Sequence, residues 1–323
     1  MEFAPKKRMQ LFAGRSNEPL AREVASHLGL ELCNPNLVDF ADGEIRSTLG
    51  ESVRGSDVFI LQTHSAPVND HIMEQLIMID AAKRASAKRI TAVCPLYGYA
   101  RQDRKAAGRE PITAKLVADL LTKAGADRVV SIDLHSGQIQ GFFDIPFDHL
   151  TAMPVMVEHL RYLVGPGAVI VSPDTGRVKV AERFAKHLDA DVASVYKRRS
   201  KTTVDSVQAL DIMGEVEGRV CVLVDDMVAT AGTICAAADL LMDSGATEVY
   251  GVATHGILSG PAIQRIEKSA MKKLIITNTL ALPPEKRHEK IEVVSIAPLL
   301  ADAISAVFED ASVSDIFGGE NQS

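Results

Sequence analysis

The stretch LVDDMVATAGTICAAADLLMDSGA, residues 223–246, predicts a strand, a tight turn and a helix in direct succession. RVCVLVDD (219–226) is a continuous apolar run that ends in two acids, which is typical of a buried strand in a parallel sheet. TICAAADLLMDSG (233–245) predicts a helix, with Gly245 as a natural C-terminal cap. MVATAGT (227–233) is then expected to be the strand-to-helix turn.

The same alternation of strand and helix patterns runs along nearly the whole chain. It predicts an α/β protein whose sheets are mostly parallel and are flanked by helices. The expected strands are MQLFAG (9–14), DVFILQ (57–62), RITAVCP (89–95), RVVSID (128–133), AVIVSP (168–173), DVASVY (191–196), RVCVLVDD (219–226), EVYGVAT (248–254) and KLIITN (273–278). Apolar residues that recur every three to four positions predict further helices at EPLAREVASHL (18–28), HIMEQLIMIDAAKRA (71–85), ITAKLVADLLTKAG (112–125) and RVKVAERFAKHL (177–188).

A sequence repeat indicates two similar halves. ADLLTKAGADRVVSIDLH (118–135) and ADLLMDSGATEVYGVATH (238–255) share several residues at identical spacing. Duplication explains the match best, although generic helix-strand patterns account for part of it. The 323 residues also favour two domains. We expect the boundary within residues 145–167, where the alternation is interrupted.

Composition narrows the class of protein. The net charge is −7, which disfavours a general nucleic-acid or anionic-membrane footprint, so a polyanionic ligand has to meet local basic clusters. The four cysteines form no CxxC pair, as is typical of a reducing cytoplasm. We find no signal-peptide pattern and no apolar run of about 18 residues, so we expect a cytoplasmic protein that makes no membrane contact.

The turn in the opening stretch has the chemistry of a phosphate site. The backbone N–H groups of Thr230, Ala231, Gly232 and Thr233 are able to converge on an anion, and the helix dipole adds to the attraction. No Lys follows the turn and no GxxxxGK[ST] motif is present, so we expect a phosphate monoester. The two acids before the turn, Asp225 and Asp226, would accept hydrogen bonds from vicinal ribose hydroxyls or hold Mg²⁺ through water. The alternative is a Ser/Thr-type helix cap of the kind found in any α/β protein.

Two basic segments are candidates for phosphate contacts. ARQDRKAAGR (100–109) suits a clamp on a triphosphate, or else it is a solvated loop; its cations are Arg101, Arg104, Lys105 and Arg109. YKRRSK (196–201) is either a solvated turn or a set of cations that close over a transferring diphosphoryl group; its cations are Lys197, Arg198, Arg199 and Lys201.

Two further residues allow a structural and a functional interpretation. Phe40 in FADGEI (40–45) offers an aromatic face for adenine, with Asp42 and Glu44 as acceptors, but a single Phe beside a turn is usually a core residue. His135 follows a predicted buried strand, where a histidine is more often structural than a ligand.

Long motifs resemble those of ribose-phosphate pyrophosphokinases almost from end to end. The turn, in which two acids, two apolar residues and one variable residue precede TAGT, resembles the phosphoribosyl pyrophosphate loop of this family and of type I phosphoribosyltransferases. Other segments resemble the pyrophosphokinases more specifically: LFAGRSNEPLA (11–21), FADGEIRSTLGESVRG (40–55), EQLIMIDAAKRASAKRITAVCPLYGYARQDRK (74–105), EPITAKLVADLL (110–121), DLHSGQIQGFFDIP (133–146), VIVSPDTGRVKVAERFAKHL (169–188) and SIAPLLADAI (295–304).

The resemblance implies a fold and an activity. The fold is two duplicated phosphoribosyltransferase-like domains, residues 8–155 with ATP-binding segments and 156–316 with the ribose 5-phosphate loop, the chain near 297–310 packing back on the first. The reaction transfers the diphosphoryl group of ATP to the anomeric hydroxyl of ribose 5-phosphate. It gives AMP and 5-phosphoribosyl 1-diphosphate for nucleotide, histidine and tryptophan biosynthesis. The resemblance also implies that the protein uses Mg²⁺. It implies a homo-oligomer, expected to be a hexamer, with an ATP site shared between subunits. Phosphate and ADP are the implied allosteric effectors.

The resemblance also assigns roles to individual residues. It implies catalytic roles for Lys197 and Arg199 and metal binding by His135 and Asp174. The implied ATP-binding residues are Phe40, Asp42, Gly43, Glu44, Arg101, Gln102 and Asp103. The implied ribose 5-phosphate-binding residues are Arg199, Asp225, Asp226, Ala229, Thr230, Ala231, Gly232 and Thr233.

Ala229 departs from the family pattern, which usually has Asp at this position. An alanine provides neither a proton acceptor nor a charged group for a metal-bound water. Adenine phosphoribosyltransferases also have Ala before their turn, so backbone binding of phosphate is compatible with it. The alternatives to an active pyrophosphokinase are a catalytically impaired or regulatory pyrophosphokinase-associated subunit, and a phosphoribosyltransferase.

Overall fold

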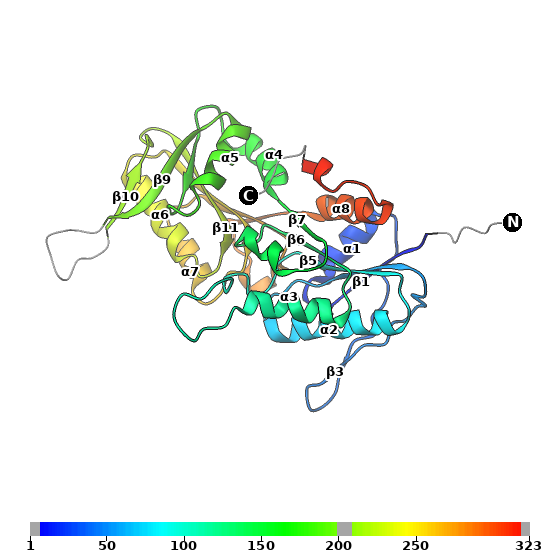
Figure 1. The fold of residues 1–323 in the computed structure, drawn as a ribbon. Coiled ribbons are helices and arrows are strands. Elements are labelled where there is room, and N and C mark those ends of the chain that lie inside the picture. Colours follow the sequence, from blue (N-terminus) through cyan, green and yellow to red (C-terminus); the bar gives the residue numbers. More distant parts are fainter. Residues whose placement is uncertain (1–6, 199–208, 318–323) are drawn as a thin grey trace. The chain divides into compact units, whose positions relative to one another are not determined.

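The computed structural model describes residues 7–198 and 209–317, and its contacts divide the chain into two compact units (Figure 1). Unit 1 comprises the described residues of Met1–Thr151, Thr279–Ala281 and Ser295–Ser323. Unit 2 comprises the described residues of Ala152–Asn278 and Leu282–Val294. Each unit contains its own mostly parallel sheet, covered by helices, so the α/β class expected from the sequence is confirmed.

Unit 1 contains a five-stranded parallel sheet in the order β1-β4-β5-β6-β7. Its strands are β1 (Met9–Ala13), β4 (Asp57–Leu61), β5 (Arg89–Cys94), β6 (Arg128–Ile132) and β7 (Phe147–Leu150). Its α-helices are α1 (Glu18–His27), α2 (Val68–Arg84), α3 (Thr113–Ala124) and α8 (Ala297–Glu309). α2 packs beside α3 and α1 packs beside α8, on opposite faces of the sheet (Figure 1). The 3₁₀ turns are η1 (Arg15–Asn17), η2 (Gly137–Phe142) and η4 (Ser314–Phe317).

A separate antiparallel hairpin also belongs to unit 1. It consists of β2 (Val38–Asp39) and β3 (Ile45–Arg46), paired in the register Val38 to Arg46 and Asp39 to Ile45. Its strands are short, and β3 lies against α2. An isolated two-stranded ribbon is only marginally stable in water, so contacts with the rest of the unit are needed to fix its direction.

Unit 2 contains a seven-stranded sheet in the order β10-β9-β8-β11-β12-β13-β14, in which only the β10–β9 pair is antiparallel. Its strands are β8 (Val169–Ser172), β9 (Asp191–Arg198), β10 (Ala209–Met213), β11 (Val220–Val228), β12 (Glu248–Gly256), β13 (Lys273–Thr277) and β14 (Ile291–Val294). One apolar cluster packs α4 (Met153–Leu163) and α5 (Val178–Leu188) on one face. A second cluster packs α6 (Gly232–Asp243) and α7 (Ala262–Lys268) on the other, and η3 (Pro284–Lys286) precedes β14.

Within this second sheet, successive strands are added first on one side and then on the other. From β8 the chain moves outward to β9, and from β11 it moves the opposite way to β12 and β13. α5 and α6, the helices that follow β8 and β11, therefore cover opposite faces of the sheet. The carboxyl ends of two strands at such a reversal are the usual ligand site of open parallel sheets.

The sequence patterns located the long elements and missed short or atypical ones. All nine expected strands and the expected helices are present. The interruption near residues 145–167 instead contains β7 and α4, and the sequence patterns also gave no expectation for β10, β14, α7 and α8. α4 begins with Pro154 in its first turn, where the missing N–H costs nothing, so the proline that breaks the pattern is compatible with a helix start.

The two repeat segments occupy equivalent helix-strand pairs, α3 with β6 and α6 with β12. They differ in what precedes the helix: residues 95–112 lie between β5 and α3, whereas residues 229–231 alone lie between β11 and α6. The long connection in unit 1 carries the basic segment, and the short one in unit 2 is the candidate phosphate turn.

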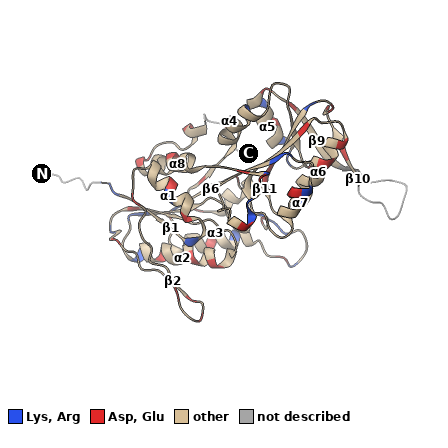
Figure 2. Cartoon of the chain, turned by 180° about the vertical axis from the view of Figure 1, so that it is seen from behind, with Lys and Arg blue, Asp and Glu red and all other residues tan. Residues whose placement is uncertain are grey.

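The charged side chains are spread over both units. Lys and Arg are interspersed with Asp and Glu in both units rather than gathered on one large basic face (Figure 2). No helix in residues 7–198 and 209–317 combines the length and the apolar character needed to cross a membrane.

Helix α3 provides a test of the packing. Leu121 is fully buried against the sheet, whereas its neighbour Leu120 is 42% exposed. We expect Leu121→Ala to lower the free energy of unfolding by about 2–5 kcal/mol, because the substitution leaves a cavity. Leu120→Ala, the matched control, should change it by about 0.5 kcal/mol or less. Urea denaturation followed by circular dichroism measures both, and equal effects would contradict the assigned orientation of α3.

Candidate functional site

Two carboxylates lie near the carboxyl end of β11, beside the point where the strand order reverses. Asp226 is 9% exposed and Asp225 is half-buried. The sequence predicted that the strand would end at these acids, but β11 continues to Val228, which pairs with Gly256 of β12. Its pairing with β12 extends further than its apolar run, so both acids are held on a rigid strand rather than in the turn.

Arg177 connects these acids to the neighbouring strand. It lies in the loop between β8 and α5, and its guanidinium contacts Asp226 Oδ1 at 2.7 Å through Nη2 and Asp225 Oδ1 at 3.4 Å through Nε. β8 pairs directly with β11, so the carboxyl ends of the two strands lie together. Our interpretation of the sequence assigned Arg177 no role, because its partners are remote in the chain and no local pattern identifies them.

The environment of Asp225 favours its protonated form. Burial is the main cause that raises the pKa of this carboxyl, and the hydrogen bond and negative charge shared with Asp226 raise it further. The positive charge of Arg177 acts in the opposite direction. A bound cation, or hydroxyl groups that donate hydrogen bonds, would stabilise the ionised form. A cation or a hydroxyl-bearing ligand would therefore lower the electrostatic free energy of the acidic pair.

The turn after β11 presents backbone donors to an anion. α6 begins at Gly232, and its N-terminal cap residue Ala231 has φ 57° and ψ 10°, a left-handed conformation that a non-glycine residue rarely adopts. No side chain caps the helix, so its first N–H groups remain available. Thr230 and Thr233 are exposed at the same place. This geometry is compatible with the phosphate turn predicted from the sequence, and that role stays a prediction.

Arg265 and Ser259 donate hydrogen bonds to the carbonyl oxygens of this turn. Arg265 Nη1 donates to the carbonyl oxygen of Thr230 at 2.9 Å, and the backbone N–H of Ser259 donates to the carbonyl oxygen of Ala229 at 2.8 Å. A Cβ added at Gly232 would lie 3.2 Å from Arg265 Nη1, so a side chain there would crowd the contact. The carbonyl groups of the turn are thus engaged on one side, which leaves its N–H groups for a ligand.

Asp174 lies in the same loop as Arg177. Its Oδ1 accepts a hydrogen bond from the backbone N–H of Gly176 at 2.8 Å, and its carbonyl oxygen accepts one from Ser172 Oγ at 2.5 Å. Its side chain is exposed. Unit 2 therefore places Asp174, Arg177 and the acids of β11 at one edge of its sheet.

The predicted ligand His135 belongs to unit 1, in the loop that follows β6. It is half-buried. His149 of β7 supports this loop, because its Nε2 accepts a hydrogen bond from the backbone N–H of Leu134 at 2.8 Å. The structure tests neither the pairing of His135 with Asp174 nor its structural alternative, and both stay predictions.

The basic segment of unit 1 is exposed. Its loop is shaped by Glu110, whose carboxylate accepts hydrogen bonds from the backbone N–H groups of Ala106 and Ala107. Gln102 Oε1 accepts one from Thr113 Oγ1 at 2.6 Å, which fixes this side chain at the start of α3. The four cations of this segment make no ion pair with any described residue; they are Arg101, Arg104, Lys105 and Arg109. Such groups are available to an anionic ligand.

The β2–β3 hairpin presents the other candidate ATP residues. Phe40 is 47% exposed, so it is not a core residue, and Arg46 lies over its ring at 5.6 Å. Asp42 and Glu44 are exposed beside it. The turn is closed by the backbone N–H of Phe40, which donates to Glu44 O at 2.8 Å, while that of Gly43 donates to Phe40 O at 2.9 Å. The exposed aromatic face favours the functional interpretation of this segment.

Magnesium is compatible with the donors present. Among the described residues, no group of three or more His, Cys, Asp or Glu side chains is arranged to hold a metal ion. Mg²⁺ keeps several waters and needs only one or two carboxylates in addition to substrate phosphates. The oxygen donors at the edge of the unit 2 sheet, Asp174, Asp225 and Asp226, meet that requirement, whereas an imidazole is a less usual ligand.

The predicted catalytic cations lie at the limit of the described structure. Lys197 is in β9, which pairs with β10, but its side chain is not among those described. Arg199 lies outside the described residues, as does Lys201. Their roles stay predictions.

Known proteins resemble the chain over almost its whole length. The family model described as the N-terminal domain of ribose phosphate pyrophosphokinase matches residues 9–125, and that of the phosphoribosyl synthetase-associated domain matches residues 201–318. A ribose-phosphate pyrophosphokinase of Streptomyces avermitilis is 53% identical over 312 residues, which covers 96% of each chain. That of Caldanaerobacter subterraneus is 53% identical over 310 residues, which covers 96% of this chain and 98% of the relative.

A solved structure agrees with these relatives. The crystal structure of phosphoribosylpyrophosphate synthetase from Mycobacterium smegmatis has a TM-score of 0.88 and 50% sequence identity. The match covers 94% of this chain and all of that one.

The raised pKa of Asp225 predicts a pH-dependent stability. The folded protein binds this proton more tightly than the unfolded chain, whose Asp pKa is about 3.9, so stability falls as the pH rises above that value. We expect Asp225→Asn to remove this loss. Without ligands or Mg²⁺, the variant should melt several degrees above the unmodified protein at pH 8 and show a smaller difference at pH 5. The exposed-pair control Asp191→Asn should show no such trend, and a constant difference for Asp225→Asn would contradict the raised pKa.

Proposed function

The chain belongs to the ribose-phosphate pyrophosphokinase family, and we propose that it is an active member of it, with its ribose 5-phosphate site at the β8–β11 switch point. The enzyme transfers the diphosphoryl group of ATP to the anomeric hydroxyl of ribose 5-phosphate. The observation that carries the location of the site is the placing of two carboxylates next to the uncapped N-terminus of α6. Acids for the sugar and N–H groups for its phosphate lie one after the other along the chain.

The reaction forms one bond and breaks another. The anomeric oxygen of ribose 5-phosphate bonds to the β-phosphorus of ATP while the bond from that phosphorus to the bridging oxygen of the α-phosphate breaks. AMP leaves, the hydroxyl proton is lost, and the product is 5-phosphoribosyl 1-diphosphate. Catalysis of such a transfer is mostly positioning and charge stabilisation.

The ribose 5-phosphate site uses the β11–α6 segment. Backbone N–H groups and hydroxyls of residues 230–233 bind the 5-phosphate, which the dipole of α6 also attracts. Asp225 and Asp226 accept hydrogen bonds from the ribose hydroxyls. Before the sugar binds, the positive charge of Arg177 compensates the negative charge of these partly buried carboxylates. Ala229 contributes through its backbone.

The ATP site uses exposed segments of unit 1. Arg101, with Gln102 and Asp103, meets the phosphates, because the four cations of this loop are exposed, make no ion pair with a described carboxylate and so are available to a polyanion in an acidic protein. The hairpin residues 40–44 bind adenine and ribose: Phe40 stacks, and Asp42, Gly43 and Glu44 supply polar contacts. The resemblance supports a homohexamer in which a neighbouring subunit provides this hairpin, a cytoplasmic location, and phosphate and ADP as effectors.

Lys197 and Arg199 are proposed to stabilise the charge that develops on the transferring diphosphoryl group. Arg199 also contacts ribose 5-phosphate. Mg²⁺, held by Asp174 together with His135 or by the acids of β11 through water, would neutralise charge on the phosphate oxygens of ATP.

Phosphorus NMR tests the activity directly. Purified protein with ATP, ribose 5-phosphate, Mg²⁺ and inorganic phosphate should form AMP and a new diphosphate ester, and neither should form without ribose 5-phosphate. The Ala229→Asp variant is run in parallel, because Ala229 stands where the family usually has Asp. Turnover by the unmodified chain would show that this carboxylate is dispensable. Turnover by the variant alone would instead favour an impaired or regulatory subunit, and a reaction independent of ATP would favour a phosphoribosyltransferase.

Arg177 should set the acid limb of the pH-rate profile. Its positive charge lowers the pKa of Asp225, so Arg177→Gln leaves that pKa higher still. We expect the acid limb of kcat/KM for ribose 5-phosphate to move upward by about one pH unit. KM for ATP should change little. A profile that falls in height without moving along the pH axis would contradict this role.

A further inference from the structure

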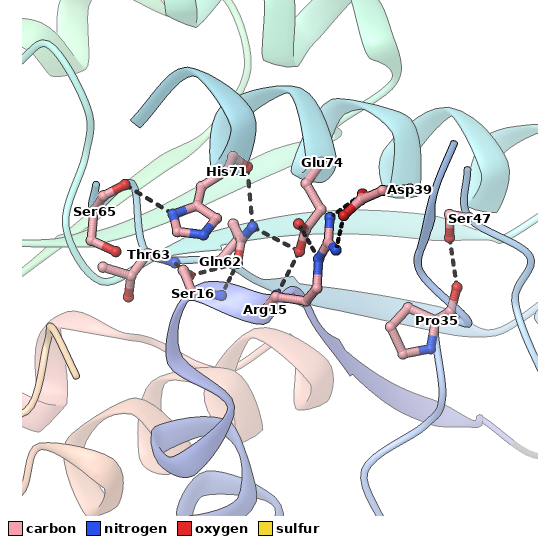
Figure 3. A network of polar contacts seen from close by, with 10 residues as sticks. All are labelled: Arg15, Ser16, Pro35, Asp39, Ser47, Gln62, Thr63, Ser65, His71 and Glu74. Atoms are coloured by element: carbon pink, nitrogen blue, oxygen red, sulfur yellow. Dashed lines mark hydrogen bonds and ion pairs between the residues drawn. The ribbon is translucent and has the colours of Figure 1, made fainter. Parts of the chain in front are cut away.

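One arginine joins the candidate ATP hairpin to the core of unit 1. Arg15 lies in η1, directly after β1, and its guanidinium faces two carboxylates (Figure 3). Nη1 and Nη2 donate to the two oxygens of Asp39, each at 2.7 Å, and Nε donates to Glu74 Oε2 at 2.9 Å. Asp39 belongs to β2 and Glu74 to α2, so a single side chain connects three segments that are remote in sequence.

The inner side of this contact is rigid. The side chain of Glu74 is 1% exposed, and its Oε1 accepts hydrogen bonds from the backbone N–H of Arg15 at 2.5 Å and from Gln62 Nε2 at 3.1 Å. Gln62 is fixed in turn by Ser16 Oγ, which donates to Gln62 Oε1 at 2.6 Å (Figure 3). A Cβ at Gly14 would lie 2.3 Å from Gln62 Oε1, so a larger residue there would displace this hydrogen-bonded amide.

The outer side of the contact is the hairpin. Hydrogen bonds at its base join Ser47 Oγ at 2.8 Å and the backbone N–H of Thr48 at 3.2 Å to the carbonyl oxygen of Pro35. Asp39 lies beyond this base and directly precedes Phe40. A planar, bidentate arginine fork fixes the direction of a carboxylate as well as its distance, which a lysine ammonium does not do.

We propose that Arg15 is a positioning residue for ATP: held by buried Glu74, it fixes Asp39 and thereby aims Phe40 and the turn that follows. This inference rests on the proposed function, in which that hairpin binds the nucleotide. The alternative is an exposed ion pair without consequence, since many such pairs contribute little to stability. The bidentate geometry and the buried partner distinguish Arg15 from the exposed Arg84–Asp80 pair on α2.

Asp39→Asn tests the anchor without disturbing the buried Glu74 contact. We expect amide hydrogen exchange to become about tenfold faster in residues 38–46 and to stay unchanged in residues 68–84. KM for ATP should rise about three- to tenfold, because the bidentate, charge-assisted contact with Arg15 is lost, whereas KM for ribose 5-phosphate and the melting temperature should stay the same. Asp39→Glu keeps the carboxylate and should recover most of the ATP affinity.

Two comparisons make the test specific. Asp80→Asn, which removes the exposed pair with Arg84, should change neither hairpin exchange nor KM for ATP. Arg15→Lys combined with Asp39→Asn should be no worse for ATP than Arg15→Lys alone, because both act through one contact. Unchanged exchange and unchanged KM in Asp39→Asn, or equal effects in Asp80→Asn, would overturn the proposal. If the unmodified protein forms no AMP, the proposed function fails, and hydrogen exchange still decides whether Arg15 anchors the hairpin.

Discussion

The reversal of strand order between β8 and β11 is the constraint on which the candidate site depends. Because the chain leaves the two strands in opposite directions, the helices that follow them cover opposite faces, and their loops face one another across the carboxyl ends of the strands. One loop contains Arg177 and Asp174, and the other is the candidate phosphate turn before α6.

The site accumulates features that a protein selected for stability alone would avoid. Asp225 and Asp226 are adjacent acids at a partly buried edge, and Ala231 has a left-handed backbone. Both features cost free energy in the absence of a ligand, and under the proposed function the hydroxyl groups and phosphate of the bound sugar offset part of that cost. Arg177 offsets part of the acidic repulsion, which allows the site to exist before the sugar arrives.

In unit 1 the candidate ATP residues 40–44 lie on a short exposed hairpin, whose direction has to be fixed by contacts with the rest of the unit. A buried carboxylate on α2 gives Arg15 a fixed position, and Arg15 transfers that rigidity to Asp39. Burial makes the inner contact strong, since removing one partner would leave an unpaired charge in the core. The outer contact is exposed, so it contributes direction rather than stability.

The features that the sequence determined by itself are those that depend on residues close together in the chain. The period of apolar residues located the long strands and helices, and the small residues of TAGT with no lysine predicted a monoester-phosphate turn. The same patterns missed β7 and α4, which are short or begin with proline, and ended β11 too early, because pairing with β12 outlasts its apolar run. Only the tertiary structure decided the strand order, the partners of Arg177 and the link from Arg15 to Asp39 and Glu74. These contacts join segments remote in the chain, and which segments meet depends on how whole elements pack, a choice that no local period or turn residue encodes.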